Sequence, residues 1–157
     1  MQLIYAHAVM TGTGTFETEP PSVEEMTERW SKIVTRGWPY LVASDAADVS
    51  RIYGFAYAQQ FRDRQAYART FEDSIYVAHT ARGMGIGAAL MSGLLGELTA
   101  LGVKEVIAVI GDLNNTASIK LHSRFGFRPV GRFEAVGHKF GKDLDVALMQ
   151  CSLRTAS

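Results

Sequence analysis

The sequence predicts a mixed α/β fold in which helices cover both faces of one sheet. Two apolar segments at residues 40–44 and 51–62, separated by a polar turn, are typical of an antiparallel hairpin. Beyond them, strand-like and helix-like segments alternate along the chain. The apolar run at residues 105–110 is typical of a strand that is buried on both faces. These observations favour antiparallel strands first and strand–helix–strand units afterwards.

The N-terminal part is predicted to hold two helices before the hairpin. Residues 1–9 are short and apolar, and they are interpreted as the end of a helix. Ser22 and Glu25 have the spacing of a capping box, in which each side chain binds the backbone N–H of the other residue. A helix is therefore expected to begin there, to run to about Thr35 and to end before Gly37.

The second half is predicted to alternate between strands and helices. Glycines that follow the apolar periodic segments mark the expected helix ends. The predicted strands span residues 72–78, 105–110, 127–136 and 145–153. The predicted helices span residues 85–101 and 116–125.

Length and composition restrict the class of protein. A chain of 157 residues has the size of a single domain, so residues 1–157 are expected to form one. Lys plus Arg and Asp plus Glu both number 16, and no basic cluster carries interleaved aromatics, so no nucleic-acid partner is expected. The single Cys151 excludes an intrachain disulfide and a multi-cysteine metal site, and no metal is expected. Without a run of about 18 apolar residues or a signal-peptide pattern, the sequence predicts no membrane contact and a cytoplasmic location.

The most informative segment is the glycine-rich turn Arg82-Gly83-Met84-Gly85-Ile86-Gly87-Ala88, which leads into a predicted helix. Glycine lacks a Cβ atom, so it tolerates positive φ and lets a ligand approach the backbone. The first N–H groups of a helix have no acceptor within it, and the macrodipole makes that end electropositive. Three glycines beside an arginine exceed what a ligand-free turn requires. The segment therefore predicts a phosphate or pyrophosphate site, with a plain strand-to-helix turn as the alternative.

A dinucleotide site is a second interpretation of the same glycines. Gly83-x-Gly85-x-x-Ala88 matches that fingerprint, and Asp112, after the next strand, stands where a ribose-binding acid is expected. In such a unit the glycines follow their strand almost at once, whereas residues 79–82 intervene here. The unit also usually begins its domain, whereas a meander of strands precedes it here. A dinucleotide-binding oxidoreductase is therefore the more distant alternative.

Two motifs resemble those of the GCN5-related N-acetyltransferase (GNAT) superfamily. Arg82-x-x-Gly85-x-Gly87 is similar to its pyrophosphate loop, and Asn115-x-x-Ser118-x-x-Leu121-His122-x-x-x-Gly126-Phe127 is similar to its next motif. Within the superfamily, the chain resembles the phosphinothricin and the methionine sulfoximine or sulfone acetyltransferases. The segments that carry this closer resemblance are Phe16-x-Thr18-Glu19-Pro20, Trp38–Ala43, Gly54–Ala58, Arg64-x-Ala66-Tyr67, Glu72-x-Ser74-Ile75-Tyr76-Val77, Ala108–Gly111 and Lys139–Gly141.

The resemblance implies a mostly antiparallel sheet with one splayed strand pair, and acetyl-CoA as the cosubstrate. Relatives carry an edge strand and most of the first helix before the position of Met1, so that strand is expected to be missing here. Backbone groups of the glycine-rich turn are implied to hold the pyrophosphate, and those of the third strand to pair with the pantetheine arm. The residues implied to bind the cosubstrate are Tyr76, Val77, Ala78, Arg82, Gly83, Met84, Gly85, Ile86, Gly87, Ala88, Asn115 and Ser118.

Glu72 matches the proposed catalytic glutamate of the family, and it is expected to act as the general base, directly or through one water. An amine nucleophile is mostly protonated at neutral pH, so a base is required near it. A solvated glutamate on an edge strand is the alternative. The Val77 N–H is implied to donate to the thioester oxygen, an interaction that contributes ~3 kcal/mol to lowering the barrier.

His122 stands where many family members carry a tyrosine that donates a proton to the leaving thiolate. Imidazolium could perform that step, since its ordinary pKa lies near working pH. A core histidine bonded to a backbone carbonyl is an equal alternative. Asp73, beside Glu72, is expected on the opposite face of its strand because side chains alternate. Whether His138 takes part in the reaction is left open.

On the acceptor side, the resemblance implies that Phe16, Arg64, Tyr67 and Ser74 bind the substrate. A guanidinium suits a carboxylate, phosphinate or sulfoximine group. The implied activity is transfer of acetyl from acetyl-CoA to the amino group of a small amino-acid-like compound by direct attack. The implied role is detoxification of an antibiotic or herbicide by a homodimer. Because of the missing strand, a module that binds acyl-CoA with little or no turnover is the alternative.

Overall fold

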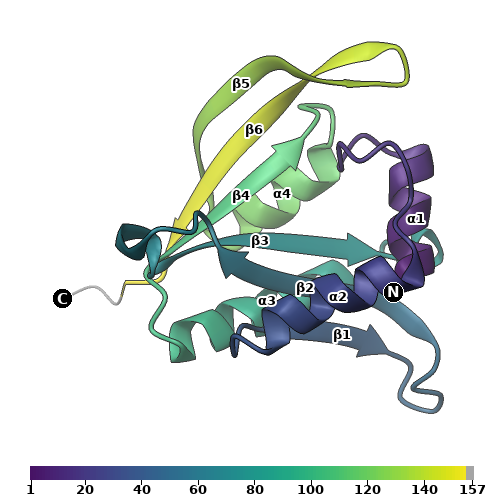
Figure 1. Ribbon diagram of the computed structural model, residues 1–157, viewed down its shortest axis with the longest axis horizontal. Coiled ribbons are helices and arrows are strands. Elements are labelled where there is room, and N and C mark those ends of the chain that lie inside the picture. Colours follow the sequence, from purple (N-terminus) through teal and green to yellow (C-terminus); the bar gives the residue numbers. More distant parts are fainter. Residues whose placement is uncertain (155–157) are drawn as a thin grey trace.

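Six strands form one sheet in the computed structural model, which describes residues 1–154 (Figure 1). Their order is β1-β2-β3-β4-β6-β5, and all neighbours are antiparallel except β3 and β4, which are parallel. The strands are β1 (Tyr40–Ser44), β2 (Ile52–Gln60), β3 (Thr70–Val77), β4 (Glu105–Gly111), β5 (Arg128–Lys139) and β6 (Lys142–Ser152). The predicted mixed and mostly antiparallel sheet is confirmed.

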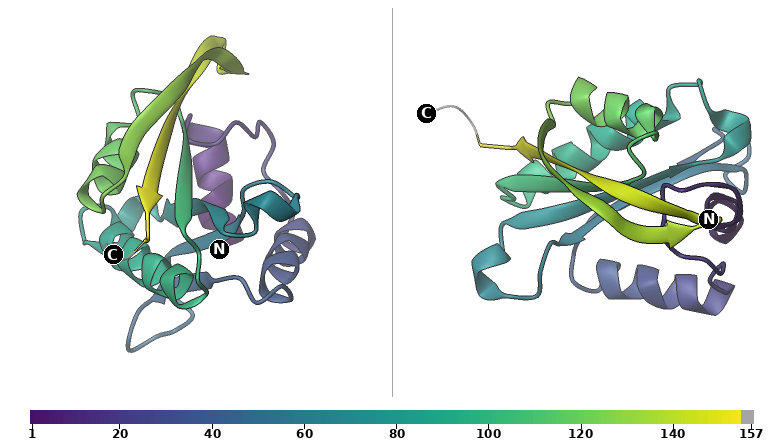
Figure 2. Two further views of the ribbon diagram at one scale, coloured as in Figure 1. Left: turned by 90° about the vertical axis from the view of Figure 1, so that its left-hand side faces the viewer. Right: turned by 90° about the horizontal axis from the view of Figure 1, so that it is seen from above.

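Within residues 1–154, four α-helices lie on the two faces of this sheet (Figure 2). They are α1 (Gln2–Thr11), α2 (Val23–Val34), α3 (Ile86–Ala100) and α4 (Thr116–Arg124). Helices α1 and α2 cover one face, and α3 and α4 cover the other. Two single-turn 3-10 helices, η1 (Gln65–Tyr67) and η2 (His79–Ala81), were not predicted. None of the helices in this part of the chain is long and apolar enough to cross a bilayer.

The beginning of α2 follows from the capping box that the sequence predicts. The Ser22 Oγ accepts a hydrogen bond from the Glu25 N–H at 3.1 Å, and the Ser22 N–H donates to Glu25 Oε2 at 2.8 Å. The two bonds satisfy N–H groups that precede the first helical bond. The helix is followed by Gly37 with φ of +70°, a value that favours glycine.

Helix α3 supplies most of the larger core. Leu90, Met91, Leu94 and Leu98 are buried there. They pack against alanines on β2 and apolar side chains of β3 and β4 in one continuous cluster. A smaller cluster on the other face joins α1 to the sheet, where Tyr5 and Val9 of the helix pack against the aromatic side chains of β2. The sheet therefore has a separate apolar layer on each face.

Strands β3 and β4 form a fork. Their parallel ladder consists of the pairs Thr70–Glu105, Phe71–Val106 and Glu72–Ile107. Beyond Glu72, β3 continues to pair with β2, while β4 continues to pair with β6. The expected splayed strand pair is thus confirmed, and Glu72 lies at the closed end of the fork.

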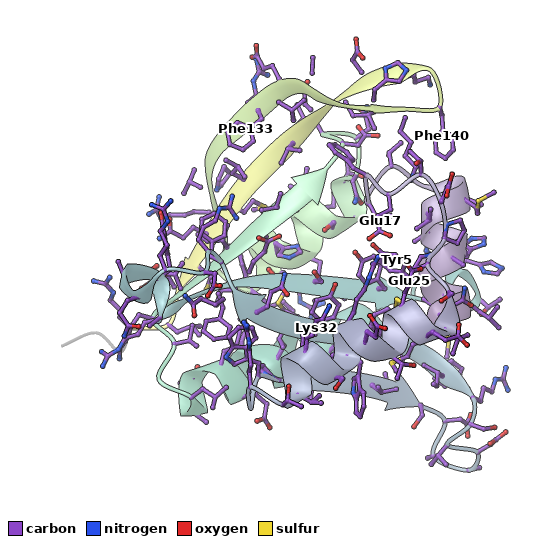
Figure 3. All side chains as sticks on the ribbon, in the orientation of Figure 1. Tyr5, Glu17, Glu25, Lys32, Phe133 and Phe140 are labelled. Atoms are coloured by element: carbon purple, nitrogen blue, oxygen red, sulfur yellow. The ribbon has the colours of Figure 1, made fainter. Side chains whose placement is uncertain are left out.

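Strands β5 and β6 form a long twisted ribbon that extends past the rest of the sheet (Figure 1). The ladder of this ribbon shifts in register between Phe133 and Gly137, where Ala135 adopts a φ of +50°. Apolar side chains are exposed on it, including Phe133 at 52% and Phe140 at 56% (Figure 3). More than half of each of these two side chains is open to solvent in the described part of the chain.

Candidate active site

A groove of about 750 Å³ fills the open part of the fork. Its walls are β3, β4, α1, the segment that leads into α3, and one side of α4. The lining includes Asp73, Ser74, Ile75, Tyr76, Val77, Arg82, Gly83, Gly85, Ile86, Gly87, Ala88, Asn115, Ser118 and His122. Most residues that the sequence assigned to a cosubstrate site therefore meet in one place. Met84 and Ala78 are not part of the lining, and the Met84 side chain is exposed.

The glycine-rich turn has the backbone that its sequence predicts. Gly83 and Gly85 have φ of +79° and +81°, and Gly85 is the N-cap residue of α3. A Cβ at either position would meet no other heavy atom of the described chain within 4 Å. The first helical bond joins the Ala89 N–H to the Gly85 O at 3.0 Å, so the preceding N–H groups are available to a ligand. This arrangement fits a diphosphate group.

The backbone of β3 also faces the groove. The Ala78 N–H donates to the Tyr53 O of β2 at 2.8 Å, and the Phe61 N–H donates to the Thr70 O at 3.0 Å. Successive N–H groups of a strand point to opposite edges. The N–H groups of Ile75 and Val77 therefore point toward β4, at the place where β4 has diverged. A donor at Val77 is in position for an extended ligand, whereas the Ala78 N–H is already used within the sheet.

His122 of α4 is held between two acceptors. Its Nδ1 lies 2.8 Å from the Ser118 backbone O, and its Nε2 lies 3.0 Å from Asp73 Oδ2. The side chains of His122 and Asp73 are only 6% and 1% exposed. A carbonyl can only accept, so Nδ1 carries a proton, and a second proton lies between Nε2 and Asp73. The carbonyl bond that the core-histidine alternative implies is present, and sequence reasoning missed the carboxylate partner.

The position of Asp73 decides the pKa of His122. Burial alone would lower the pKa of His122, but the hydrogen bond and charge of Asp73, together with the Ser118 carbonyl, raise it above its ordinary value. The second carboxylate oxygen, Asp73 Oδ1, is buried and has no hydrogen-bond partner within residues 1–154. Strand alternation had placed Asp73 on the face that α4 covers, which was the available signal for this pair.

Glu72 points to the opposite face of β3. It is half-buried, and burial raises the pKa of its carboxyl, while the charge of Arg62 opposes this shift and the charge of Asp73 adds to it. Across the β2–β3 ladder it pairs with Gln59. Glu72 is thus a partly desolvated carboxylate at the closed end of the fork, rather than a freely solvated side chain on an edge strand.

A second cavity, of about 410 Å³, lies on the face of the sheet that α1 and α2 cover (Figure 3). We call it the cationic cavity. It is lined by Tyr5, Glu17, Arg29, Lys32, Ile33, Arg36, Trp38, Tyr57 and Gln59. Sequence reasoning did not select the three cations of this cavity. Their spacing of three and four residues along a helix was the available signal.

The loop between α1 and α2 separates the groove from the cationic cavity, because residues 11–15 line the first and Glu17 lines the second. The Thr13 hydroxyl donates to Asp112 Oδ2 at 2.6 Å. The buried Lys139 Nζ donates to the Thr15 O at 2.9 Å. The Tyr5 hydroxyl donates to Glu17 Oε1 at 2.7 Å. These bonds fix the loop to α1, to the segment after β4 and to the end of β5.

The residues assigned to the acceptor side do not gather in one place. Ser74 lines the groove, but Arg64 and Tyr67 are exposed around η1 and line neither cavity. The Phe16 ring packs closely over Gly111, where a Cβ would lie 2.9 Å from the ring. His138 Nδ1 lies 2.7 Å from Asp143 Oδ1 on the ribbon, and both side chains are 69% exposed.

Asn115 is the N-cap residue of α4. Asn115 Oδ1 accepts from the Ser118 N–H at 3.3 Å at the start of α4. The groove side of α4 therefore begins with a fixed amide and a serine hydroxyl. Within residues 1–154, no group of three or more His, Cys, Asp or Glu side chains is arranged to hold a metal ion.

A forked sheet, a glycine-rich turn before a helix and a half-buried carboxylate at the closed end of the fork together define an acyl-transfer class of site. The chain belongs to the acetyltransferase (GNAT) family, whose model matches residues 4–127. The protein is therefore an N-acetyltransferase, and the family assignment excludes the dinucleotide-binding oxidoreductase. The resemblance that the motifs indicated is confirmed.

Similar proteins carry narrower names. The phosphinothricin N-acetyltransferase of Alcaligenes faecalis is 44% identical over 147 residues, which are 94% of this chain and 73% of that protein. The L-methionine sulfoximine/L-methionine sulfone acetyltransferase of Pseudomonas aeruginosa is 35% identical over 150 residues, covering 96% and 86%. The crystal structure of a phosphinothricin acetyltransferase from Sinorhizobium meliloti in complex with AcCoA superposes with a TM-score of 0.92 at 47% identity, covering 97% and 80%.

Proposed function

We propose that this enzyme transfers the acetyl group of acetyl-CoA to the amino group of a small amino-acid-like compound, of the phosphinothricin or methionine sulfoximine and sulfone type. The observation that carries the proposal is the fork. Its open part exposes N–H groups of β3 and of the α3 N-terminus. Glu72 is the last paired residue at its closed end, just outside the residues that line the groove. The names and identities of the relatives support the acceptor class.

Different residues of the groove would contact different parts of the cosubstrate. The N–H groups that precede the first bond of α3, with Arg82, would hold the diphosphate. The backbone of Val77 and the side chain of Asn115 lie further along the groove, where the pantetheine arm would pass. Acetyl-CoA supplies the activated thioester. The protein's part is to aim its carbonyl carbon toward the face on which Glu72 stands.

Glu72 would take the proton of the attacking ammonium group. Its raised pKa brings the carboxylate closer to the pH at which a base works best. The Val77 N–H would donate to the carbonyl oxygen, where negative charge develops during the reaction. A fixed donor of this kind stabilises the transition state by ~3 kcal/mol.

The proton for the leaving sulfur would come from the side of α4. Both ring protons of His122 face acceptors, Asp73 and the Ser118 carbonyl. The Ser118 hydroxyl lies 3.3 Å from His122 Nδ1 and lines the groove. We infer that Ser118 hands its proton to the sulfur while His122 replaces it, so that His122 acts through Ser118.

The test is release of thiol from acetyl-CoA with a panel of amino acids. Glu72→Gln is expected to lower kcat by a factor of about a hundred or more, because the acid–base step is lost while the backbone donors remain. Glu28→Gln, an exposed carboxylate on α2, is the matched control and is expected to keep the wild-type rate. Equal rates for the two variants would remove Glu72 from its role. Binding of acetyl-CoA without thiol release on any amine would support the non-catalytic alternative.

We also infer that the chain forms a homodimer through the apolar side chains that the β5–β6 ribbon exposes. Phe133 pairs with Val146 at the end of the β4–β6 ladder, and Val136 follows it in the irregular part of the ribbon. Both side chains are more than half exposed in the described chain. Burial of such side chains against a second copy removes apolar surface from water. The cytoplasmic location stays a prediction of the sequence.

A further inference from the structure

We propose that the cationic cavity binds an oxyanionic group of the acceptor, a carboxylate or phosphinate, at the end of the molecule distant from the reacting amine. This inference rests on the proposed function and adds to it the chemistry of the acceptor's second end. The residues that line the groove do not bind this oxyanionic group, because the two cavities lie on opposite sides of the α1–α2 loop.

The side chains that line the cavity carry more positive than negative charge. Arg29 binds Glu17 through two contacts, Nη1 to Oε1 at 2.7 Å and Nη2 to Oε2 at 3.3 Å. The carboxylate is thus already neutralised, and the Tyr5 hydroxyl bonds to it as well. Lys32 and Arg36 form no ion pair with any residue of the described chain. An anion that enters the cavity therefore meets two cations that lack a partner.

The helix and the aromatic walls fix the cations. Arg29, Lys32 and Arg36 follow one another at intervals of three and four residues, which places them on one side of α2 and its C-terminal extension. The Arg36 guanidinium lies over the Trp38 ring at 4.8 Å from its centroid, so its edge stays available for hydrogen bonds. The buried Ile33 lies at the base of the cavity.

The wall of the cavity includes the cross-strand neighbour of Glu72, although Glu72 itself lines neither cavity. Gln59 lines it and pairs with Glu72 across the β2–β3 ladder, and Tyr57 lines it and pairs with Ser74. Residues that pair across antiparallel strands have their side chains on the same face, with Cβ atoms about 5 Å apart. An acceptor that lies across β2 and β3 would thus place its amine at Glu72 and its other end among the cations. This span suits an amino acid whose side chain ends in an anion.

The test compares two acceptors that differ in the charge of their distal group, phosphinothricin with its phosphinate and methionine sulfone with its neutral sulfone. In the double variant Lys32→Gln/Arg36→Gln, the KM for phosphinothricin is expected to rise about tenfold to a hundredfold, since charge-assisted hydrogen bonds are lost. The kcat for phosphinothricin, the KM for methionine sulfone and the KM for acetyl-CoA are expected to change less than about threefold.

Lys120→Gln is the matched control, because it removes one exposed positive charge from α4 outside both cavities. It is expected to leave all three KM values unchanged. An equal effect of the double variant on both acceptors, or no effect on either, would overturn the proposal. Thermal melting of each variant distinguishes these results from misfolding.

A second measurement keeps this inference separate from the proposed function. Phosphinothricin is titrated calorimetrically into wild-type and double-variant protein that is saturated with CoA. If the wild type releases no thiol with any amine, the proposed function fails, but weaker binding of phosphinothricin to the double variant still supports the cavity. Absence of binding to the wild type, or equal binding to both proteins, overturns it.

Discussion

Glu72 and Asp73 are neighbours in the chain, yet their carboxylates have opposite surroundings. Glu72 points to the face of the sheet that carries the cationic cavity, and Asp73 points beneath α4 to His122. One is half-buried with a raised pKa, and the other is fully buried and shares a proton with an imidazole. Two adjacent residues at the end of the β3–β4 ladder thus place one carboxylate on each face of the sheet.

Asp73→Asn is expected to lower the pKa of His122 from its raised value to below the ordinary one, because burial, the largest single effect, is then opposed only by the Ser118 carbonyl. Histidine resonances followed by NMR over a pH series measure the shift directly. Asp45→Asn removes a partly exposed carboxylate in the β1–β2 turn, far from α4, and it is expected to leave the His122 titration unchanged. An unaltered His122 pKa in Asp73→Asn would contradict the pairing.

The Asp73–His122 pair also makes the free energy of unfolding depend on pH. The folded pKa of His122 lies above its unfolded value, so the folded state binds the proton more tightly. This contribution to the free energy of unfolding is complete below the unfolded pKa and is lost as pH rises through the raised folded pKa. Denaturation of the wild type over this range should show that loss, whereas Asp73→Asn should show little of it.

At the scale of elements, the turn before α3 combines two requirements in a short segment. It must reverse the chain at positive φ, and it must present N–H groups without side chains in front of them. The helix behind it is anchored by four buried apolar side chains, so the N–H groups are held by the core rather than by the turn alone. Rigid elements thus set the geometry of the proposed diphosphate site.

Gly85→Ala is expected to raise the KM for acetyl-CoA and to destabilise the fold by about 1–2 kcal/mol, because an alanine resists left-handed backbone conformation. Gly96→Ala in the same helix is the control. Position 96 is exposed and has open space for a Cβ, so alanine should stabilise by about 0.5–1 kcal/mol and leave the KM unchanged. Steady-state kinetics and chemical denaturation measure both. Similar KM values in the two variants would contradict the assigned site.

The elements themselves were largely predictable, because their signals are local. The capping box of α2 and the apolar run of β4 depend on residues that are close in sequence. The pairing of Asp73 with His122 joins residues 49 positions apart, and the cationic cavity combines α1, the following loop, α2 and β2. No periodicity reports which helix face lies over which strand. The part of the site that one segment builds was therefore predicted, and the part that several segments build was not.

At the scale of the whole molecule, the two cavities share one partition and one strand pair. The α1–α2 loop divides them, and of the paired strands β2 and β3, β2 lines the cationic cavity and β3 lines the groove. The ribbon of β5 and β6 contacts this arrangement near its tip, where Lys139 binds the Thr15 carbonyl and the Phe16 ring packs over Gly137. The exposed apolar side chains of the ribbon are free of any part in the groove, and they are the surface that we assign to a second copy.

Light scattering after gel filtration is expected to report about twice the 17.2 kDa mass for the wild type and a single copy for Phe133→Ser/Val136→Ser. The double variant removes two apolar side chains, each more than half exposed, from the inferred contact. Val49→Ser, which changes an exposed apolar side chain in the β1–β2 turn, should remain a dimer. A monomeric wild type, or a dimer that persists in the double variant, would refute the ribbon contact.

Every cation of the second cavity comes from α2 and the residues just after it, and none of them holds the sheet together. Substitution of these side chains during evolution would change which amine is accepted. The groove for acetyl-CoA would stay unchanged, because other residues line it. A family built in this way can diversify its acceptors by changing one surface helix.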